Sequence, residues 1–194
     1  MTVGRIMIMT VVLVLVATWA YAADCNNGGR YEYMGDGTVT DCRTGTIWLK
    51  DAMCTDPSGG IVNPTGHLTW YDAMKWVAGL HDGLCGLTDG SSAGDWRLPT
   101  ITEWMAMVAY AKKIWTNPAL SNGAGTGQWT DGDVFNNVQS YDYWSSTTHA
   151  LNEIYAYDLH MSNGFATGYI KVTEISVWSV RGGQSGSFGT LFIE

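Results

Sequence analysis

The sequence predicts a single α+β domain in which two helices pack on antiparallel sheet. Short segments at both ends of the chain, separated by glycine-containing turns, have the composition of strands. Between them, two segments place apolar residues at helical spacing, each behind a threonine that can cap a helix. The connections are long and irregular. The longest, residues 114–139, is too long for a plain connector, and its aromatic residues favour an ordered loop.

The first 22 residues have the pattern of a signal peptide. Arg5 precedes an apolar run at residues 6–17, and small residues stand where signal peptidase cleaves, so we expect cleavage after Ala22. A retained membrane anchor is the alternative, since mostly apolar character continues to Ala23 and approaches the minimum span of about 18 residues. The cleavage site favours the signal peptide. An acidic residue before Cys25 excludes lipidation there.

Residues 23–194 are expected to form one domain, because this length suits a single core. The formal net charge is −8, from 10 basic and 18 acidic residues. Generic binding to nucleic acid or to an anionic membrane needs a basic face, so this balance argues against both. After cleavage of the signal peptide we expect no membrane span.

Strands and helices follow one another in a clear order. The first strands, residues 30–34 and 39–40, join through a turn at 35–37, and residues 46–49 form the next strand. A polar loop follows at 51–66. Thr69 caps a first helix, and a second helix runs from Ile101 to about Lys113. The remaining strands are expected at residues 143–147, 154–159, 165–172 and 177–181.

Both helices carry an apolar stripe that faces the core. Basic residues at 112 and 113 favour the C-terminal end of the second helix electrostatically. The stripes consist of Trp70, Ala73, Trp76, Val77 and Leu80 in the first helix, and of Trp104, Met107, Val108 and Ala111 in the second.

The segment from Gly94 to Thr100 leads into the second helix. Thr100 and Glu103 have the spacing of a capping box, in which each side chain bonds the backbone N–H of the other residue. Pro99 keeps the preceding residue extended. Arg97 stands alone between apolar residues, and we expect it to reach a carboxylate or carbonyl groups. None of these residues is a nucleophile or a general base, so we interpret the segment as structural.

This segment also carries a family resemblance. Residues 95–100, Asp-Trp-Arg-Leu-Pro-Thr, with Glu103 are similar to the signature of the Lcl C-terminal domain family, and residues 35–50, 143–147 and 180–183 agree in order. The family occurs in a collagen-like adhesin and in many exported bacterial proteins. The resemblance implies a C-type-lectin-like fold, whose N- and C-terminal strands lie close together. The chain has no Gly-X-Y tract, so it lacks the stalk of that adhesin.

Four cysteines in an exported protein suggest two disulfides, and composition alone leaves three connectivities open. The family resemblance implies a bridge between Cys54 and Cys85, which leaves Cys25 to pair with Cys42. A metal site is the alternative, but the chain has no Cys-x-x-Cys pair.

Catalytic and metal-binding signals are weak. The four histidines are scattered, and no nucleophile elbow is present, so we expect no enzymatic activity and no cofactor. Asp131 and Asp133 could supply oxygen ligands to calcium. Solvated loop acids are the alternative, since the chain lacks the tripeptides that mark calcium-dependent sugar-binding lectins of this fold.

The aromatic content points to binding. Trp115, Trp129, Tyr141 and Tyr155 fall in expected surface loops or at their edges, where aromatic rings can stack on a sugar or anchor a protein partner. The alternative places these rings under the long loops as packing.

The sequence therefore predicts an exported, disulfide-stapled binding module that acts in surface recognition or adhesion through a glycan or a surface protein. We expect it to be secreted, periplasmic or displayed at the cell surface. The alternative is a structural subunit of an envelope or extracellular assembly that binds only other protein subunits. The ligand and the oligomeric state stay open.

Overall fold

A computed structural model describes residue 25 and residues 28–182. The expected signal peptide, residues 1–22, lies outside the described residues. The elements in chain order are β1 (Tyr31–Tyr33), β2 (Thr38–Asp41), β3 (Thr46–Leu49), β4 (His67–Leu68), α1 (Trp70–Gly79), α2 (Ile101–Val108), a 3₁₀ turn (Ala111–Lys113), β5 (Asp142–Thr148), β6 (Tyr155–His160), β7 (Phe165–Ile170), β8 (Ile175–Ser176) and β9 (Val180–Gly182).

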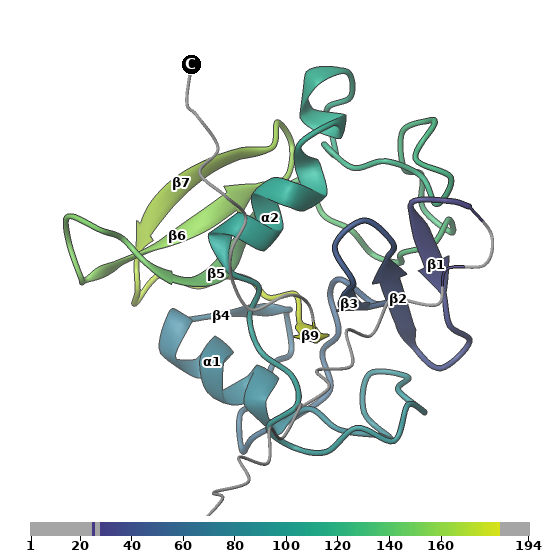
Figure 1. The fold of residues 1–194 in the computed structure, drawn as a ribbon. Coiled ribbons are helices and arrows are strands. Elements are labelled where there is room, and N and C mark those ends of the chain that lie inside the picture. Colours follow the sequence, from purple (N-terminus) through teal and green to yellow (C-terminus); the bar gives the residue numbers. More distant parts are fainter. Residues whose placement is uncertain (1–24, 26–27, 183–194) are drawn as a thin grey trace, which may run out of the picture.

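The strands form two sheets, which confirms the α+β prediction (Figure 1). The smaller sheet has the order β1-β2-β3-β9 and is antiparallel throughout. Because β1 and β9 are its two edges, the first and last described strands share one sheet. The larger sheet has the order β4-β8-β5-β6-β7, with a single parallel pairing between β5 and β8.

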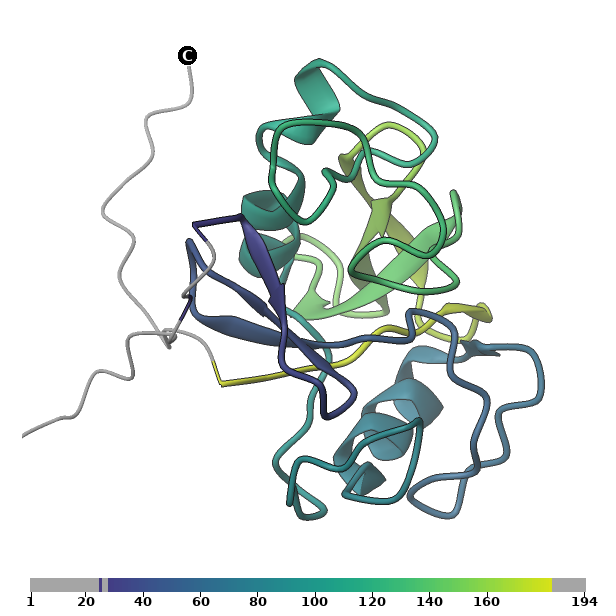
Figure 2. The same ribbon diagram turned by 90° about the vertical axis from the view of Figure 1, so that its right-hand side faces the viewer.

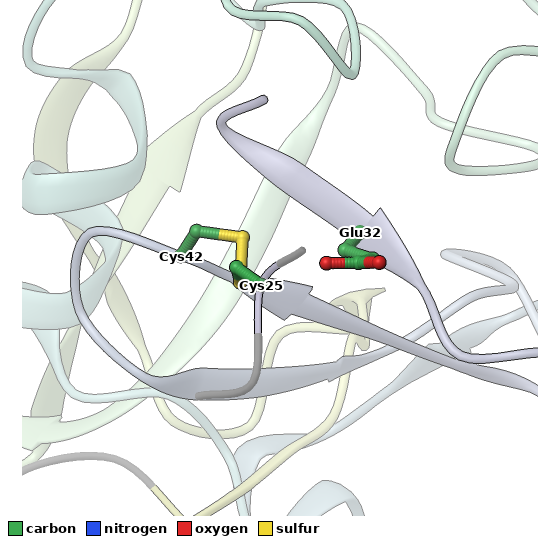
Figure 3. A group of neighbouring side chains, drawn as sticks. All are labelled: Cys25, Glu32 and Cys42. Atoms are coloured by element: carbon green, nitrogen blue, oxygen red, sulfur yellow. A yellow bond between two sulfur atoms is a disulfide. The ribbon is translucent and has the colours of Figure 1, made fainter. Parts of the chain in front are cut away.

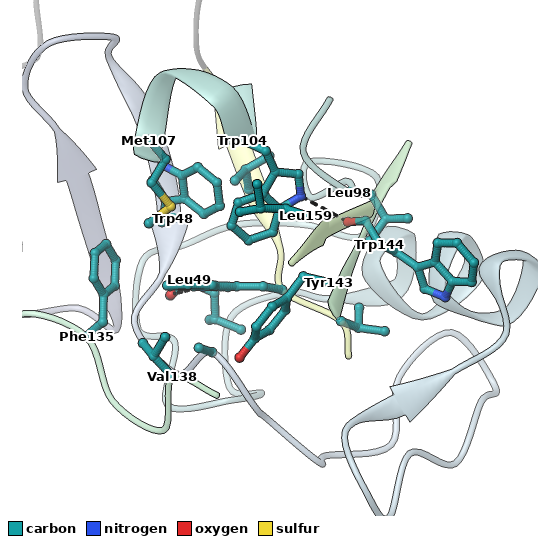
Figure 4. Close-up of a cluster of buried hydrophobic side chains, with 14 of the residues drawn as sticks. Trp48, Leu49, Leu98, Trp104, Met107, Phe135, Val138, Tyr143, Trp144 and Leu159 are labelled. Carbon is teal, nitrogen blue, oxygen red and sulfur yellow. Dashed lines mark hydrogen bonds between the residues drawn. The ribbon is translucent and has the colours of Figure 1, made fainter. Parts of the chain in front are cut away.

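Helix α2 connects the two sheets through the Trp104 side chain. Its indole ring lies 4.9 Å from that of Trp48 in β3 and 5.6 Å from the Tyr143 ring in β5, measured between centroids. Trp178, just before β9, contacts all three rings. Figure 4 shows this cluster, with the Trp104 N–H donating to the carbonyl oxygen of Trp144. The indole N–H groups of Trp104 and Trp178 both donate to backbone carbonyl oxygens, whereas the buried Trp48 N–H has no partner among the described residues.

The long connection at residues 114–141 is ordered and contributes to the core. Phe135 packs edge-on against Trp178, with ring centroids 5.0 Å apart. Seen from the second direction, this loop and α1 with its flanking loops lie at opposite ends of the molecule (Figure 2).

A buried ion pair joins β1 to β2 and to α2. Arg30 Nη2 donates to Asp41 Oδ2 at 3.1 Å and to the carbonyl oxygen of Ala106 at 3.0 Å. Both charged side chains are at most 2% exposed. The guanidinium also lies over the Tyr31 ring.

Arg97 behaves as the sequence predicts. It donates two hydrogen bonds to the Glu103 carboxylate, at 2.8 and 2.6 Å, and further ones to the carbonyl oxygens of Leu98 and Gly182. Thr100 and Glu103 complete the capping box. The Arg97 side chain thus links the start of α2 to the end of β9.

Both disulfides have the expected pairing, of which the family resemblance implied Cys54–Cys85 and exclusion gave Cys25–Cys42. Cys25 bonds Cys42 and Cys54 bonds Cys85. The first bridge connects the N-terminal segment to the residue after β2, beside Glu32 of β1 (Figure 3).

The structure corrects some expected element bounds. Helix α2 ends at Val108, and a 3₁₀ turn replaces the expected last helical turn, a common ending for a helix. The two-residue strands β4 and β8 were not expected. Within the described part of the chain, no helix has the length and apolar character needed to cross a membrane.

Candidate binding cleft

A surface cleft of about 450 Å³ opens where four distant segments meet. These segments are the β1–β2 hairpin, residues 50–56 after β3, residues 85–86 on the other side of the Cys54–Cys85 disulfide, and Asn136 of the long loop. The polar and aromatic side chains at the cleft are those of Tyr33, Lys50, Asp51, Thr55, Asp56 and Asn136. Its volume lies within the range of small-ligand sites.

Backbone hydrogen bonds hold the cleft walls together. The Lys50 N–H donates to the Gly37 carbonyl oxygen at 2.9 Å, and the Asn136 N–H donates to the Lys50 carbonyl oxygen at 2.9 Å. The Ala52 N–H returns a bond to the Asn136 carbonyl oxygen. The cleft is therefore built on paired backbone and does not depend on long side chains for its shape.

Gly37 allows the hairpin turn to approach the disulfide loop. Its φ is +86°, and a Cβ at this position would lie 2.4 Å from the Gly86 carbonyl oxygen. Only glycine accepts both the backbone conformation and this contact. The approach of the hairpin turn to Gly86, both of which line the cleft, thus depends on Gly37.

Lys50 supplies the positive charge of the cleft. Its ammonium donates to Asn136 Oδ1 at 3.0 Å and lies 4.9 Å from the centroid of the Tyr33 ring. Among the described residues, no carboxylate forms an ion pair with Lys50. The ammonium therefore keeps hydrogen-bond donors for a ligand.

The two carboxylates of the cleft are each fixed through one oxygen. Asp51 Oδ1 accepts from the Met53 N–H at 3.0 Å and from Asn137 Nδ2 at 2.9 Å. Asp56 Oδ2 accepts from the Cys85 N–H at 2.6 Å. These hydrogen bonds orient both carboxylates, and the second oxygen of each can accept a hydrogen bond from a ligand.

A separate acid cluster lies on the larger sheet. It consists of Asp142, Asp158, His160, Thr167 and Tyr169, from the three adjacent strands β5, β6 and β7. His160 Nδ1 lies 2.6 Å from Asp142 Oδ1, and the Thr167 hydroxyl donates to the Asp158 carboxylate, at 2.8–2.9 Å from its two oxygens. Asp142 also interacts electrostatically with the Tyr169 hydroxyl. The Asp142 and Asp158 carboxyls are also hydrogen-bonded.

Burial dominates the electrostatics of this cluster. Asp158 is fully buried, and desolvation together with the nearby Asp142 charge raises the pKa of its carboxyl to about 7. The same Asp142 charge raises the pKa of the Tyr169 hydroxyl. The Asp158 carboxyl therefore takes up its proton at a much higher pH than an ordinary aspartate.

The four aromatic residues expected to bind ligand do not come together, and none lines the cleft. Trp115 is half-buried against Tyr110, with ring centroids 5.6 Å apart. Tyr141 is 60% exposed just before β5, and Tyr155 is half-buried in β6.

The expected exposure of Trp129 was wrong. Its side chain is 7% exposed, belongs to the hydrophobic core, and donates its indole N–H to the Phe135 carbonyl oxygen at 3.2 Å. The polar loop sequence around it suggested a surface position, but the loop folds back and buries this ring.

The acids expected to bind calcium hold the long loop together. Asp133 accepts from the N–H groups of Gly123 and Val134, and Asp131 accepts weakly from the Asn137 N–H. In the described part of the chain, the only close groups of three ligand-type side chains each contain a disulfide, with Glu32 in one (Figure 3). The calcium site stays a prediction.

Sequence reasoning missed the residues that form the cleft. Lys50 was noted only as part of the motif after β3, and Asp51 and Asp56 only as part of a polar loop. No spacing in the sequence brings Asn136 to them. The one local signal was the change from the apolar strand β3 to charged residues at positions 50 and 51.

The sequence model of the Lcl C-terminal domain matches residues 37–181. The chain belongs to this family. Among curated proteins, no sequence matches the chain significantly. The region of the Lcl C-terminal domain includes Lys50, Asp51, Asp56 and Asn136, whereas Tyr33 precedes it. Membership in this family and the two disulfides fit an extracellular domain.

Proposed function

We propose that this protein is an exported binding module that acts in surface recognition or adhesion, with a glycan or a protein ligand held in the cleft. The proposal includes a C-type-lectin-like arrangement of the domain. The observation that carries it is the cleft itself, whose polar groups are fixed by backbone contacts and keep donors and acceptors for a ligand. Such preorganisation lowers the entropic cost of binding.

A binding role is favoured over catalysis by what the reactive side chains contact. His160 pairs with Asp142, and His149 stacks on Tyr157 with ring centroids 4.7 Å apart. The cysteines within the described residues are all in disulfides. A nucleophile next to a general base, which acyl transfer or hydrolysis would use, is not among these contacts.

The proposal that the protein is exported rests on the expected signal peptide and on the disulfides. A signal peptide cleaved after Ala22 would deliver the chain to an oxidising compartment, where both bridges persist. Mass spectrometry of the mature N-terminus and fractionation of the producing cells test this part. An intact leader in a membrane fraction would contradict it.

A bulky substitution in the cleft tests the binding site. Thr55 is exposed and lines the cleft, so Thr55→Trp fills it without removing a buried contact. Thr126→Trp, at an exposed loop position outside the cleft, is the matched control. Both proteins are applied to a glycan array, with calcium and with EDTA, and to crosslinking on surface proteins. We expect the ligands bound by wild type to be retained by Thr126→Trp and lost by Thr55→Trp; equal binding by both variants would contradict the proposal.

A structural role in an assembly is the second candidate, and one apolar patch favours it. Leu151, Ile154, Ile170 and Val172 gather at one end of the larger sheet and are 38–91% exposed. The Lys171 N–H donates to the Ile154 carbonyl oxygen, which places the two turns side by side. Exposed apolar patches mark contact surfaces. Analytical ultracentrifugation of wild type and of a Leu151→Ser/Val172→Ser variant tests this role, and a monomer in both cases would count against it.

A further inference from the structure

We propose that the cleft recognises a neutral sugar through two neighbouring hydroxyl groups, and that it does so without a metal ion. This inference rests on the proposed function, because it names the ligand class of the same cleft. It follows from the hydrogen-bond inventory of the cleft, from the pairing of the strands around it, and from the position of the Lys50 ammonium.

The cleft presents donors and acceptors together. Lys50 has three N–H donors, of which one is directed at Asn136, and the Asn136 amide still has its own N–H₂ donors. Asp51 and Asp56 each keep one carboxylate oxygen as an acceptor. A hydroxyl group both donates and accepts, so a pair of neighbouring hydroxyls on a sugar ring can use a mixed set of this kind. A purely anionic or cationic ligand would meet repulsion from one half of it.

The exposed ring of Tyr33 completes the site. Tyr33 is 47% exposed at the rim, and the Lys50 ammonium over its ring holds it in place. The C–H groups of a pyranose ring pack well on an aromatic surface, while its hydroxyls point to polar groups. This combination distinguishes a sugar from a simple polar solute.

Strands β2 and β3, beside the cleft, offer no free edge to a peptide that would bind by adding a strand. Strand β2 lies between β1 and β3, and β3 lies between β2 and β9. On the outer side of β1, the N–H groups of Arg30 and Tyr31, at the start of the strand, both donate to the Gly123 carbonyl oxygen. Peptide binding by strand addition needs an open edge. The cleft therefore favours a ligand held by side chains.

The Lys50 ammonium is the one positively charged group among the residues that line the cleft. In the described part of the chain, the one group of three ligand-type side chains at the cleft consists of Asp56 and two disulfide-bonded cysteines. Sulfurs in a disulfide are not thiolate ligands. Binding is thus expected to persist in EDTA.

The test measures sugar binding by calorimetry and saturation-transfer NMR. The probes are neutral methyl pyranosides and the corresponding oligosaccharides. A sulfated polysaccharide is tested in parallel as an anionic ligand. Lys50→Met and Asp56→Asn remove a donor and an acceptor, and we expect each to weaken binding of a neutral sugar at least tenfold. Lys75→Met makes the same change at an exposed position on α1 and should leave affinity unchanged.

The Tyr33 ring is tested separately. Tyr33→Phe should retain binding and Tyr33→Ala should lose it, whereas Tyr71→Ala, with a similarly exposed ring on α1, should have no effect. Circular dichroism spectra and melting curves confirm that each variant is folded.

The outcomes separate this inference from the proposed function. Affinity for a neutral sugar that is unchanged between about 50 and 500 mM salt and in EDTA supports the inference, since charge-driven binding is screened by salt. Binding only of the sulfated probe, or binding abolished by EDTA, overturns the ligand class. If no sugar binds but a protein ligand is lost in Thr55→Trp, the inference fails and the proposed function stands. Ligand binding that Thr55→Trp does not affect overturns both.

Discussion

Replacing Asp158 by asparagine is expected to stabilise the protein at neutral and alkaline pH. The buried carboxyl has a pKa of about 7, against an ordinary value of 3.8, so folding favours its protonated form. Asparagine is neutral at every pH and has a similar shape. Its amide can donate to Asp142 and accept from the Thr167 hydroxyl, as the protonated acid does.

The size of the effect follows from linkage. Because the pKa of Asp158 is raised in the folded state, its contribution to stability is fullest below the unfolded pKa and is lost as pH rises towards 7. One pKa unit is worth about 1.4 kcal/mol. Between pH 5 and pH 7 the advantage of Asp158→Asn over wild type should therefore grow by about 2 kcal/mol, because the slope falls as the folded carboxyl begins to ionise near pH 7.

Urea denaturation of both proteins at pH 5, 6, 7 and 8 measures this difference. Thr126→Ala, at an exposed loop position without an ionisable group, is the control and should run parallel to wild type at every pH. If the free energies of unfolding of wild type and Asp158→Asn changed in parallel with pH, the pKa of Asp158 would not be raised. Asp158 would then be ionised in the folded protein, which would refute the reasoning. A variant that is less stable than wild type at pH 8 would refute it as well.

Three further changes test the supports of the fold. Arg30→Met leaves the Asp41 charge buried without its partner and should cost about 3–5 kcal/mol in urea denaturation; a loss below about 1 kcal/mol would contradict the burial of this pair. Gly37→Ala places a Cβ at a residue with positive φ and against the Gly86 carbonyl oxygen. It should lower the free energy of unfolding by about 1–3 kcal/mol and weaken ligand binding in the cleft. Unchanged ligand affinity would show that the turn does not shape the cleft. Replacing both Cys54 and Cys85 by serine should lower the free energy of unfolding by about 3–4 kcal/mol, because the bridge closes a loop with a sequence separation of 31. A melting temperature equal to that of wild type would contradict this expectation.

Helix starts could be predicted because their signals are local. The Thr69 side chain accepts from the Asp72 N–H, and Thr100 and Glu103 form the full capping box, as their spacing indicated. The reach of Arg97 to a carboxylate and to carbonyl groups was also predicted, since an isolated cation between apolar residues needs partners. By contrast, β8 contains two residues, and only its pairing with β4 and β5 defines it as a strand.

The site was harder to predict because its residues meet only in the folded chain. Lys50 and Asn136 are 86 positions apart, yet their side chains share a hydrogen bond of 3.0 Å. Trp129 was placed on the surface because its neighbours are polar, but packing of the long loop buries its ring. The local composition correctly predicted a polar loop, but it does not determine whether a single side chain in that loop points outward or into the core.

Chemical-shift mapping with a ligand found on the glycan array or by crosslinking tests the central claim most directly. Ligand addition is expected to shift the resonances of Tyr33, Lys50 and Asn136, around the cleft, and to leave those of Tyr141 and Tyr155 unchanged. Shifts confined to Tyr141, Tyr155 and the larger sheet would contradict it and place binding on the surface first expected from the aromatic residues.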